Sequence, residues 1–128
     1  MLIHLDTSVM VDAFTGPRRS LRHVESATAA GHVLAYCAVV EYDWLRGPRT
    51  SNETEAVRRF FGARAVVPFG EPEAATASAL YRGVKRARQR QADLVVAACA
   101  IEHGARLWTL NVEDFDDVPG LTLYPPPG

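Results

Sequence analysis

Short apolar stretches, bounded by polar residues or by glycine and proline, recur along the chain. Stretches of about four to eight residues in this setting are typical of buried strands, whereas amphipathic helices need longer periodic segments. The pattern predicts strands at residues 2–6, 32–37, 65–69, 107–110 and 121–124.

Helix-start and helix-stop signals lie between these strands. Thr7 or Ser8 can cap a first helix, and Pro72 suits the first turn of a later one. Single glycines and Gly-Pro pairs mark where helices end. The pattern predicts helices at residues 8–14, 18–30, 38–46, 51–61, 71–91 and 93–103. We expect the last of these to be buried, because it is apolar on almost every side.

The alternation of strands and helices determines the fold class. Strands joined through helices imply crossover connections, and therefore a parallel sheet with helices on its faces. The predicted class is α/β, a three-layer α/β/α sandwich with a mainly parallel central sheet. Ligands of such sheets bind beyond the carboxyl ends of the strands. Residues that directly follow a strand are therefore the first candidates for a functional site.

Length and composition fit one compact domain. The chain has 128 residues, 48% hydrophobic and 23% charged, and a chain of this size buries about two thirds of its unfolded surface. We expect a single domain over residues 1–128, with 125–128 as a short extended tail. The longest apolar run, residues 94–101, is far shorter than the roughly 20 residues of a membrane span. The start of the chain does not resemble a secretory signal, so we expect a cytoplasmic protein without membrane association.

The cysteines and histidines give no sign of metal chemistry in the sequence. Cys37 and Cys99 lie inside apolar segments, where a free thiol packs as a small hydrophobe. The four histidines show no spacing typical of a zinc site. We therefore expect both residue types to pack in the core or to cap helices.

Acidic residues follow the predicted strands. Asp6 ends the first strand, Glu41 and Asp43 follow the second, Asp93 begins the last helix, and Asp114 lies just past the fourth strand. In a parallel sheet all of these positions fall at one edge. Each acid taken alone is also a normal helix cap or turn former, so the argument rests on the set.

A set of converging carboxylates predicts a divalent cation. Carboxylates in a partly buried cleft repel one another and raise one another's pKa unless a cation lies among them. Oxygen ligands suit Mg²⁺ or Mn²⁺, which also bind substrate phosphates. One or two such ions can activate water and stabilise the leaving oxygen of a phosphodiester. The acidic set therefore predicts phosphodiester hydrolysis with Mg²⁺ or Mn²⁺ as cofactor.

Two segments contain most of these acids. They are LDTSVMVD at residues 5–12 and DLVVAACAIEHGARLWTLNVEDFDDVPGL at residues 93–121. Both resemble motifs of the PIN-domain family, and in particular of the VapC-type toxins of bacterial toxin-antitoxin pairs. The resemblance implies that Asp6, Asp93 and Asp114 ligate the metal, and that Ser8 and Asn111 lie beside them.

The resemblance also implies an activity and partners. A VapC-type chain is expected to be a metal-dependent endoribonuclease that cuts single-stranded or loop RNA, as the toxin of a VapBC-type pair. It is expected to form a homodimer and to be neutralised by a cognate antitoxin protein.

The second acidic position is open between Glu41 and Asp43. The family usually has a Glu four residues before a Gly; counting back from Gly47 gives Asp43, whereas residue type favours Glu41. Side chains two residues apart on a helix point about 200° apart, so only one of the two can face the metal. The spacing favours Asp43.

Basic residues suggest how RNA could be held. Arg82, Arg86 and Arg90 recur every four residues within the predicted helix 71–91, which would place them on one face near the acids. The alternative for these arginines is a solvated helix face without a ligand.

Other function classes fit the sequence less well. A phosphatase of the haloacid-dehalogenase type would use Asp6 as a nucleophile, but it needs a second Asp where Ser8 stands. The P-loop pattern GxxxxGK[ST] does not occur. The main alternative is a catalytically inactive PIN-fold module that binds RNA or protein, and metal binding would distinguish it from the nuclease.

Overall fold

A four-stranded sheet forms the centre of the computed structural model, which describes residues 1–125. The strands are β1 (Leu2–Leu5), β2 (Val33–Cys37), β3 (Val66–Val67) and β4 (Arg106–Trp108). Their order is β3-β2-β1-β4, and each neighbouring pair is parallel. All four strands therefore end at the same edge of the sheet. The predicted α/β class with a parallel central sheet is confirmed.

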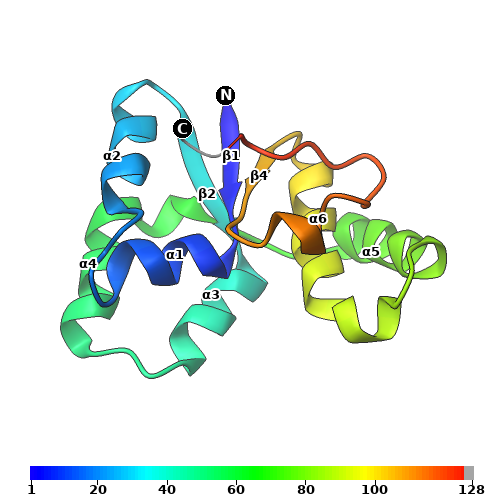
Figure 1. Cartoon of the computed structure of the whole chain (residues 1–128), viewed down its shortest axis with the longest axis horizontal. Helices are drawn as coiled ribbons and strands as arrows, with labels where there is room; N and C mark the ends of the chain where they lie inside the picture. Colours follow the sequence, from blue (N-terminus) through cyan, green and yellow to red (C-terminus); the bar gives the residue numbers. More distant parts are fainter. Residues whose placement is uncertain (126–128) are drawn as a thin grey trace.

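Helices lie on both sides of this sheet (Figure 1). On one side are α1 (Thr7–Phe14), α2 (Leu21–Ala29) and α4 (Ser51–Phe61), and on the other are α5 (Glu71–Gly83) and α6 (Gln91–Glu102). Helix α3 (Ala38–Arg46) follows β2 directly and contacts both α1 and α6. Three short 3₁₀ turns complete the elements: η1 (Ala63–Ala65), η2 (Ala87–Arg90) and η3 (Val112–Asp114).

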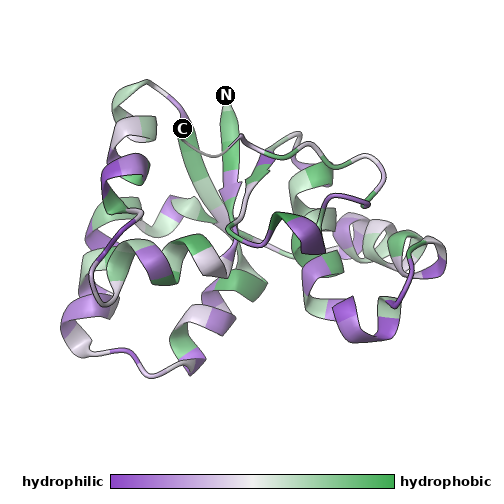
Figure 2. Cartoon of the chain, viewed as in Figure 1, coloured by the Kyte–Doolittle hydropathy of each residue, from purple (hydrophilic) through white to green (hydrophobic). Residues whose placement is uncertain are grey.

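The core lies where β1 and α6 meet. Ile3 and Leu5 of β1 are fully buried, and α6 buries six of its twelve residues, five of them consecutive, as its apolar sequence predicted. Figure 2 shows this central hydrophobic region, flanked by helices with mixed polar and apolar faces. The longest helix of the described residues, α5, has 13 residues, and none has the length and apolar character needed to cross a membrane.

The predicted helix 71–91 is wrong at its carboxyl end. Helix α5 stops at Gly83, Arg86 adopts a left-handed backbone with φ of 53°, and α6 begins at Gln91. The chain must reverse here because α6 packs against α5. Arg82, Arg86 and Arg90 therefore do not share one helical face, which corrects the predicted arginine stripe.

Other predicted bounds change at the edges of the sheet. The segment 121–124 forms only an isolated parallel bridge between Leu123 and Leu107, on the outer side of β4. Strand β3 is shorter than predicted, since residues 63–65 form a 3₁₀ turn. Helix α2 begins later than predicted, at Leu21. Of the predicted tail 125–128, residues 126–128 lie outside the described part of the chain.

Candidate functional site

Asp6 is held in a fixed orientation at the carboxyl end of β1. Its backbone N–H donates to the carbonyl of Trp108 at 2.9 Å, which joins it to the neighbouring strand β4. Its Oδ1 accepts the Thr7 N–H at 2.9 Å and caps α1, while its Oδ2 accepts the hydroxyls of Ser8 at 2.9 Å and Thr109 at 2.7 Å. These three bonds use three of the about four acceptor sites of a carboxylate, so one remains for a cation.

Asp93 faces Asp6 from the first turn of α6. The pKa of Asp93 is raised to about 6, first by burial and then by the nearby charges of Asp6, Asp114 and Asp43, against an opposing effect of Arg90. This is the signature of a carboxyl group surrounded by other acids. A cation among these side chains would remove the repulsion, and a donor set made only of oxygen suits Mg²⁺ or Mn²⁺.

One cleft joins three of the predicted acids. It has a volume of about 480 Å³ and is lined by Asp6 from β1, Asp43 from α3 and Asp93 from α6. Ser8 and Asn111 line the same cleft. The carboxyl ends of neighbouring strands thus bring together residues that are far apart in the sequence.

Asp114 lies on the other side of Asp93. A second cleft is lined by Asp93 and Asp114, together with Arg86, Arg90 and further acids of the segment 113–117. Within the described residues, no three acids bring their oxygens within 4.8 Å of one another. The acidic set is therefore an open arrangement around Asp93.

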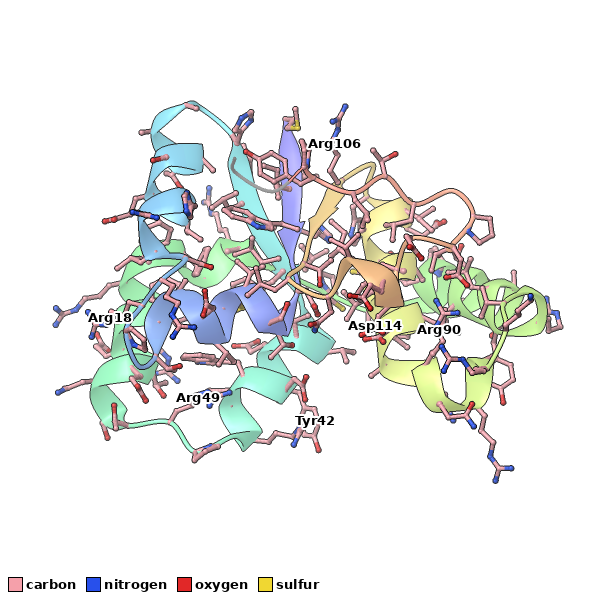
Figure 3. All side chains as sticks on the ribbon, in the orientation of Figure 1. Arg18, Tyr42, Arg49, Arg90, Arg106 and Asp114 are labelled. Atoms are coloured by element: carbon pink, nitrogen blue, oxygen red, sulfur yellow. The ribbon has the colours of Figure 1, made fainter. Side chains whose placement is uncertain are left out.

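Arg90 holds the segment that contains Asp114. Its guanidinium contacts both carboxylate oxygens of Asp117, at 2.6 and 3.0 Å, and donates to the backbone carbonyl of Asp114 at 2.9 Å. Figure 3 shows Arg90 and Asp114 side by side where η3 approaches α6. Arg90 is largely buried, with 11% of its side chain exposed. It acts here as an anchor for η3, and not as an exposed residue of a helix face.

The two candidates for the second acidic position lie in different places. Asp43 lines the cleft with Asp6 and Asp93 and forms an ion pair with Arg46 at 2.6 Å. Glu41 lines a separate pocket with Tyr36 and other residues near α4. The separation follows from the helical phase that the sequence indicated.

Thr109 is a site residue that the sequence reasoning did not single out. Besides donating to Asp6, its hydroxyl accepts the backbone N–H of Asn111 at 3.0 Å. It therefore ties the segment after β4 to the end of β1. The signal was available, since Thr109 stands two residues before Asn111 in the quoted motif.

Arg82, by contrast, is not part of the acidic site. It lines a different pocket, between α5 and α6.

The raised pKa of Asp93 predicts how pH affects stability without metal. Below pH 3.8, the unfolded pKa, the Asp93 carboxyl is protonated in both the folded and the unfolded chain. As pH rises from there through about 6, the folded pKa, the folded chain loses stability, because ionising the carboxyl costs more in the fold. In EDTA, Asp93→Asn should therefore be more stable than wild type by about 1–2 kcal/mol at pH 7.5, and this gain should vanish at pH 4. Urea unfolding at both pH values measures it. A variant less stable than wild type at pH 7.5 would contradict the electrostatic argument.

Comparisons with known proteins identify the family of the chain. The sequence profile of the PIN domain family matches residues 3–121. No curated protein sequence matches the chain significantly.

Solved structures share the fold over nearly the whole chain. A chain in the structure of VapBC2 from Rickettsia felis bound to a promoter DNA fragment has a TM-score of 0.75 and 20% identity, covering 97% of this chain and 98% of its own. DNA-bound VapBC from Salmonella typhimurium gives 0.76 and 17%, with 97% and 98% covered. A toxin-antitoxin complex from Klebsiella pneumoniae gives 0.74 and 22%, with 94% and 95% covered. By its sequence, its parallel sheet and the acids at the sheet edge, this chain belongs to the PIN domain family.

Proposed function

We propose that this chain is a Mg²⁺- or Mn²⁺-dependent endoribonuclease and the toxin of a VapBC-type pair. The observation that carries the proposal is the cleft in which Asp6, Asp43 and Asp93 meet from three separate elements. The raised pKa of Asp93 supports it, because burial and the neighbouring acids disfavour its negative charge and a bound cation would offset both effects.

The residues of the cleft would have two roles, holding the cation and orienting its ligands. Asp6, Asp43 and Asp93 would hold the cation, with Asp114 on the far side of Asp93. The chemistry that a bound Mg²⁺ or Mn²⁺ supplies is the activation of a water and the neutralisation of phosphate charge. Ser8 and Thr109 are positioning residues, because their hydroxyls orient Asp6.

Basic residues next to the cleft would hold the RNA backbone. Pro17 lines the acidic cleft and also a neighbouring surface pocket formed with Arg18, Arg19 and Arg22. On the opposite side, Arg86 lines the cleft that contains Asp114. Cations on both sides of a metal site are the arrangement expected for a protein that binds a phosphate chain. We propose single-stranded RNA as the substrate, since its backbone and bases are accessible to an open cleft.

The proposed partners follow from the relatives. The similar structures are described as VapBC and toxin-antitoxin complexes, and we propose a cognate antitoxin for this chain as well. We also propose that it works in the cytoplasm as a homodimer.

The position of the second acid gives a direct test. We expect Asp43→Asn to reduce metal-dependent cleavage of a mixed-sequence RNA at least about tenfold, because the variant lacks one charged ligand of the cleft. Glu41→Gln, two residues away on the same helix, should stay within about twofold of wild type. The assay is single-turnover cleavage in Mn²⁺, with EDTA as the blank. The opposite ranking would move the site to Glu41.

The same assay tests the alternative function. An inactive PIN-fold module would bind RNA or protein without cutting, and would have no need for a Mn²⁺ site. Absence of Mn²⁺-dependent cleavage by the wild-type chain, over RNAs of several sequences, together with no measurable Mn²⁺ binding, would favour that module.

A further inference from the structure

A second group of possible metal ligands lies between β1 and the carboxyl end of α6. His4 of β1, Cys99 of α6 and His103 just after α6 bring their ligand atoms within 4.8 Å of one another. Cys99 and His103 are four residues apart and therefore share one face of α6. Within residues 1–125 this is the only group of three His, Cys, Asp or Glu side chains packed so closely. No zinc-like spacing is visible in the sequence because His4 is far from Cys99 and His103 along the chain.

His4 is buried without a hydrogen-bond partner. It is 1% exposed, and neither ring nitrogen has a partner in the described structure. Its ring lies 5.4 Å from that of His103, measured between centroids, so it faces the group. A buried imidazole with unmet nitrogens destabilises the fold, and a valine or leucine would fill this strand position without that penalty. A ligand bound by His4 would remove it.

The distances and the surroundings suit a tetrahedral metal. Cys99 Sγ and His103 Nδ1 are 3.6 Å apart, and sulfur and nitrogen ligands of one tetrahedral zinc ion are separated by about 3.6 Å. The other ring nitrogen of His103, Nε2, lies 3.2 Å from Oε2 of the buried Glu73. A carboxylate behind a histidine in this way fixes the ring so that Nδ1 carries the free lone pair.

The charge balance and the access route also fit. One divalent cation, one thiolate and the Glu73 carboxylate sum to zero, which is the state that a buried site tolerates. The His103 side chain is 27% exposed, so an ion can enter from the surface at the end of α6. The thiol of Cys37 lies beside Cys99 and is the nearest further soft donor.

We propose that His4, Cys99 and His103 form a structural site for Zn²⁺, supported by Glu73 and separate from the acidic cleft. Sulfur and imidazole ligands select Zn²⁺ over Mg²⁺ or Mn²⁺, which prefer oxygen. The ion would fasten β1 to the carboxyl end of α6. Asp6 directly follows β1 and Asp93 lies in the first turn of α6, so the bound ion would stabilise the elements that position both acids.

The test uses the full chain, stripped with EDTA and titrated with Zn²⁺ or Co²⁺ alone. We expect one tightly bound ion per chain, a thiolate-to-cobalt charge-transfer band, and a Zn²⁺-dependent rise in Tm. Cys99→Ala should remove the band and weaken Zn²⁺ binding at least about tenfold, and Glu73→Gln should weaken it by about tenfold. Asp93→Asn, which alters only the acidic cleft, should keep both the band and the Zn²⁺ affinity.

A second variant keeps the test valid if Cys99→Ala unfolds. His4→Leu fills the same buried position with an apolar side chain, so it should fold at least as stably as the metal-free wild type and lose the Zn²⁺-dependent rise in Tm. Cobalt binding without a thiolate band, or Zn²⁺ binding unchanged in both Cys99→Ala and His4→Leu, would overturn the proposal. Loss of the ion in Asp93→Asn alone would assign the bound metal to the acidic cleft and would also overturn it.

Discussion

RNA cleavage by Asp6→Asn or Asp93→Asn is expected to fall at least about 100-fold below that of the wild-type chain in Mn²⁺. Loss of a residue that only orients a metal ligand already costs about 10–100-fold, and these two would contact the ion directly. Asn keeps the shape of Asp and is an equally good helix cap, so Asp6→Asn should still begin α1 normally. The measurement is single-turnover cleavage at saturating Mn²⁺, with circular dichroism to confirm folding.

The matched control is an acid-to-amide change away from the cleft. Glu55 of α4 is exposed and pairs only with Arg59, so Glu55→Gln should cleave as the wild type does. Cleavage that persists in both Asp6→Asn and Asp93→Asn would disprove the acidic mechanism and point to a contaminating nuclease. Cleavage lost in Glu55→Gln as well would point to a general effect of charge.

Leu107→Ala is expected to lower the free energy of unfolding by about 2–5 kcal/mol. Leu107 is fully buried in β4, pairs with His4 of β1, and its backbone bonds to the segment 122–124 on its other side. Removing its side chain leaves a cavity in the hydrophobic core beside β4. Since domains of this size are stable by only about 5–15 kcal/mol, the change should be plain in urea or thermal unfolding.

Leu110 provides the control for this substitution. It stands three residues later and is 48% exposed, so Leu110→Ala should change stability by no more than about 0.5 kcal/mol. Equal losses for the two variants would show that β4 is not buried as described.

Strand β1 and helix α6 could be predicted from the sequence because the apolar pattern of each lies within its own segment. Strand β1 and helix α6 are apolar on nearly every side, and such segments are buried in any α/β arrangement. The end of α5 could not be read in this way. Its apparent continuation past Gly83 is interrupted because α6 packs back on α5, and that tertiary packing overrides the helical preference of residues 84–90.

The candidate site was likewise predictable from the sequence only in part. The acids could be placed because each follows a strand, and parallel strands end at one edge. The choice between Glu41 and Asp43 needed the rotation of α3 relative to the sheet, which only the packed structure fixes. The role of Arg90 depends on its contacts to Asp117 and the Asp114 carbonyl, which no spacing in the sequence encodes, whereas the position of Thr109 in the motif gave a signal for its contact to Asp6.

The strand order β3-β2-β1-β4 has a consequence for the time at which the protein could become active during its synthesis. Strand β1 is synthesised long before its neighbour β4. Asp6 can donate its N–H to Trp108 and accept the hydroxyl of Thr109 only after β4 and Thr109 have emerged from the ribosome. Helix α6, with Asp93, also follows β1 by many residues. A chain that has not yet reached β4 during translation therefore has no assembled acidic cleft, because the site depends on contacts between segments far apart in the sequence.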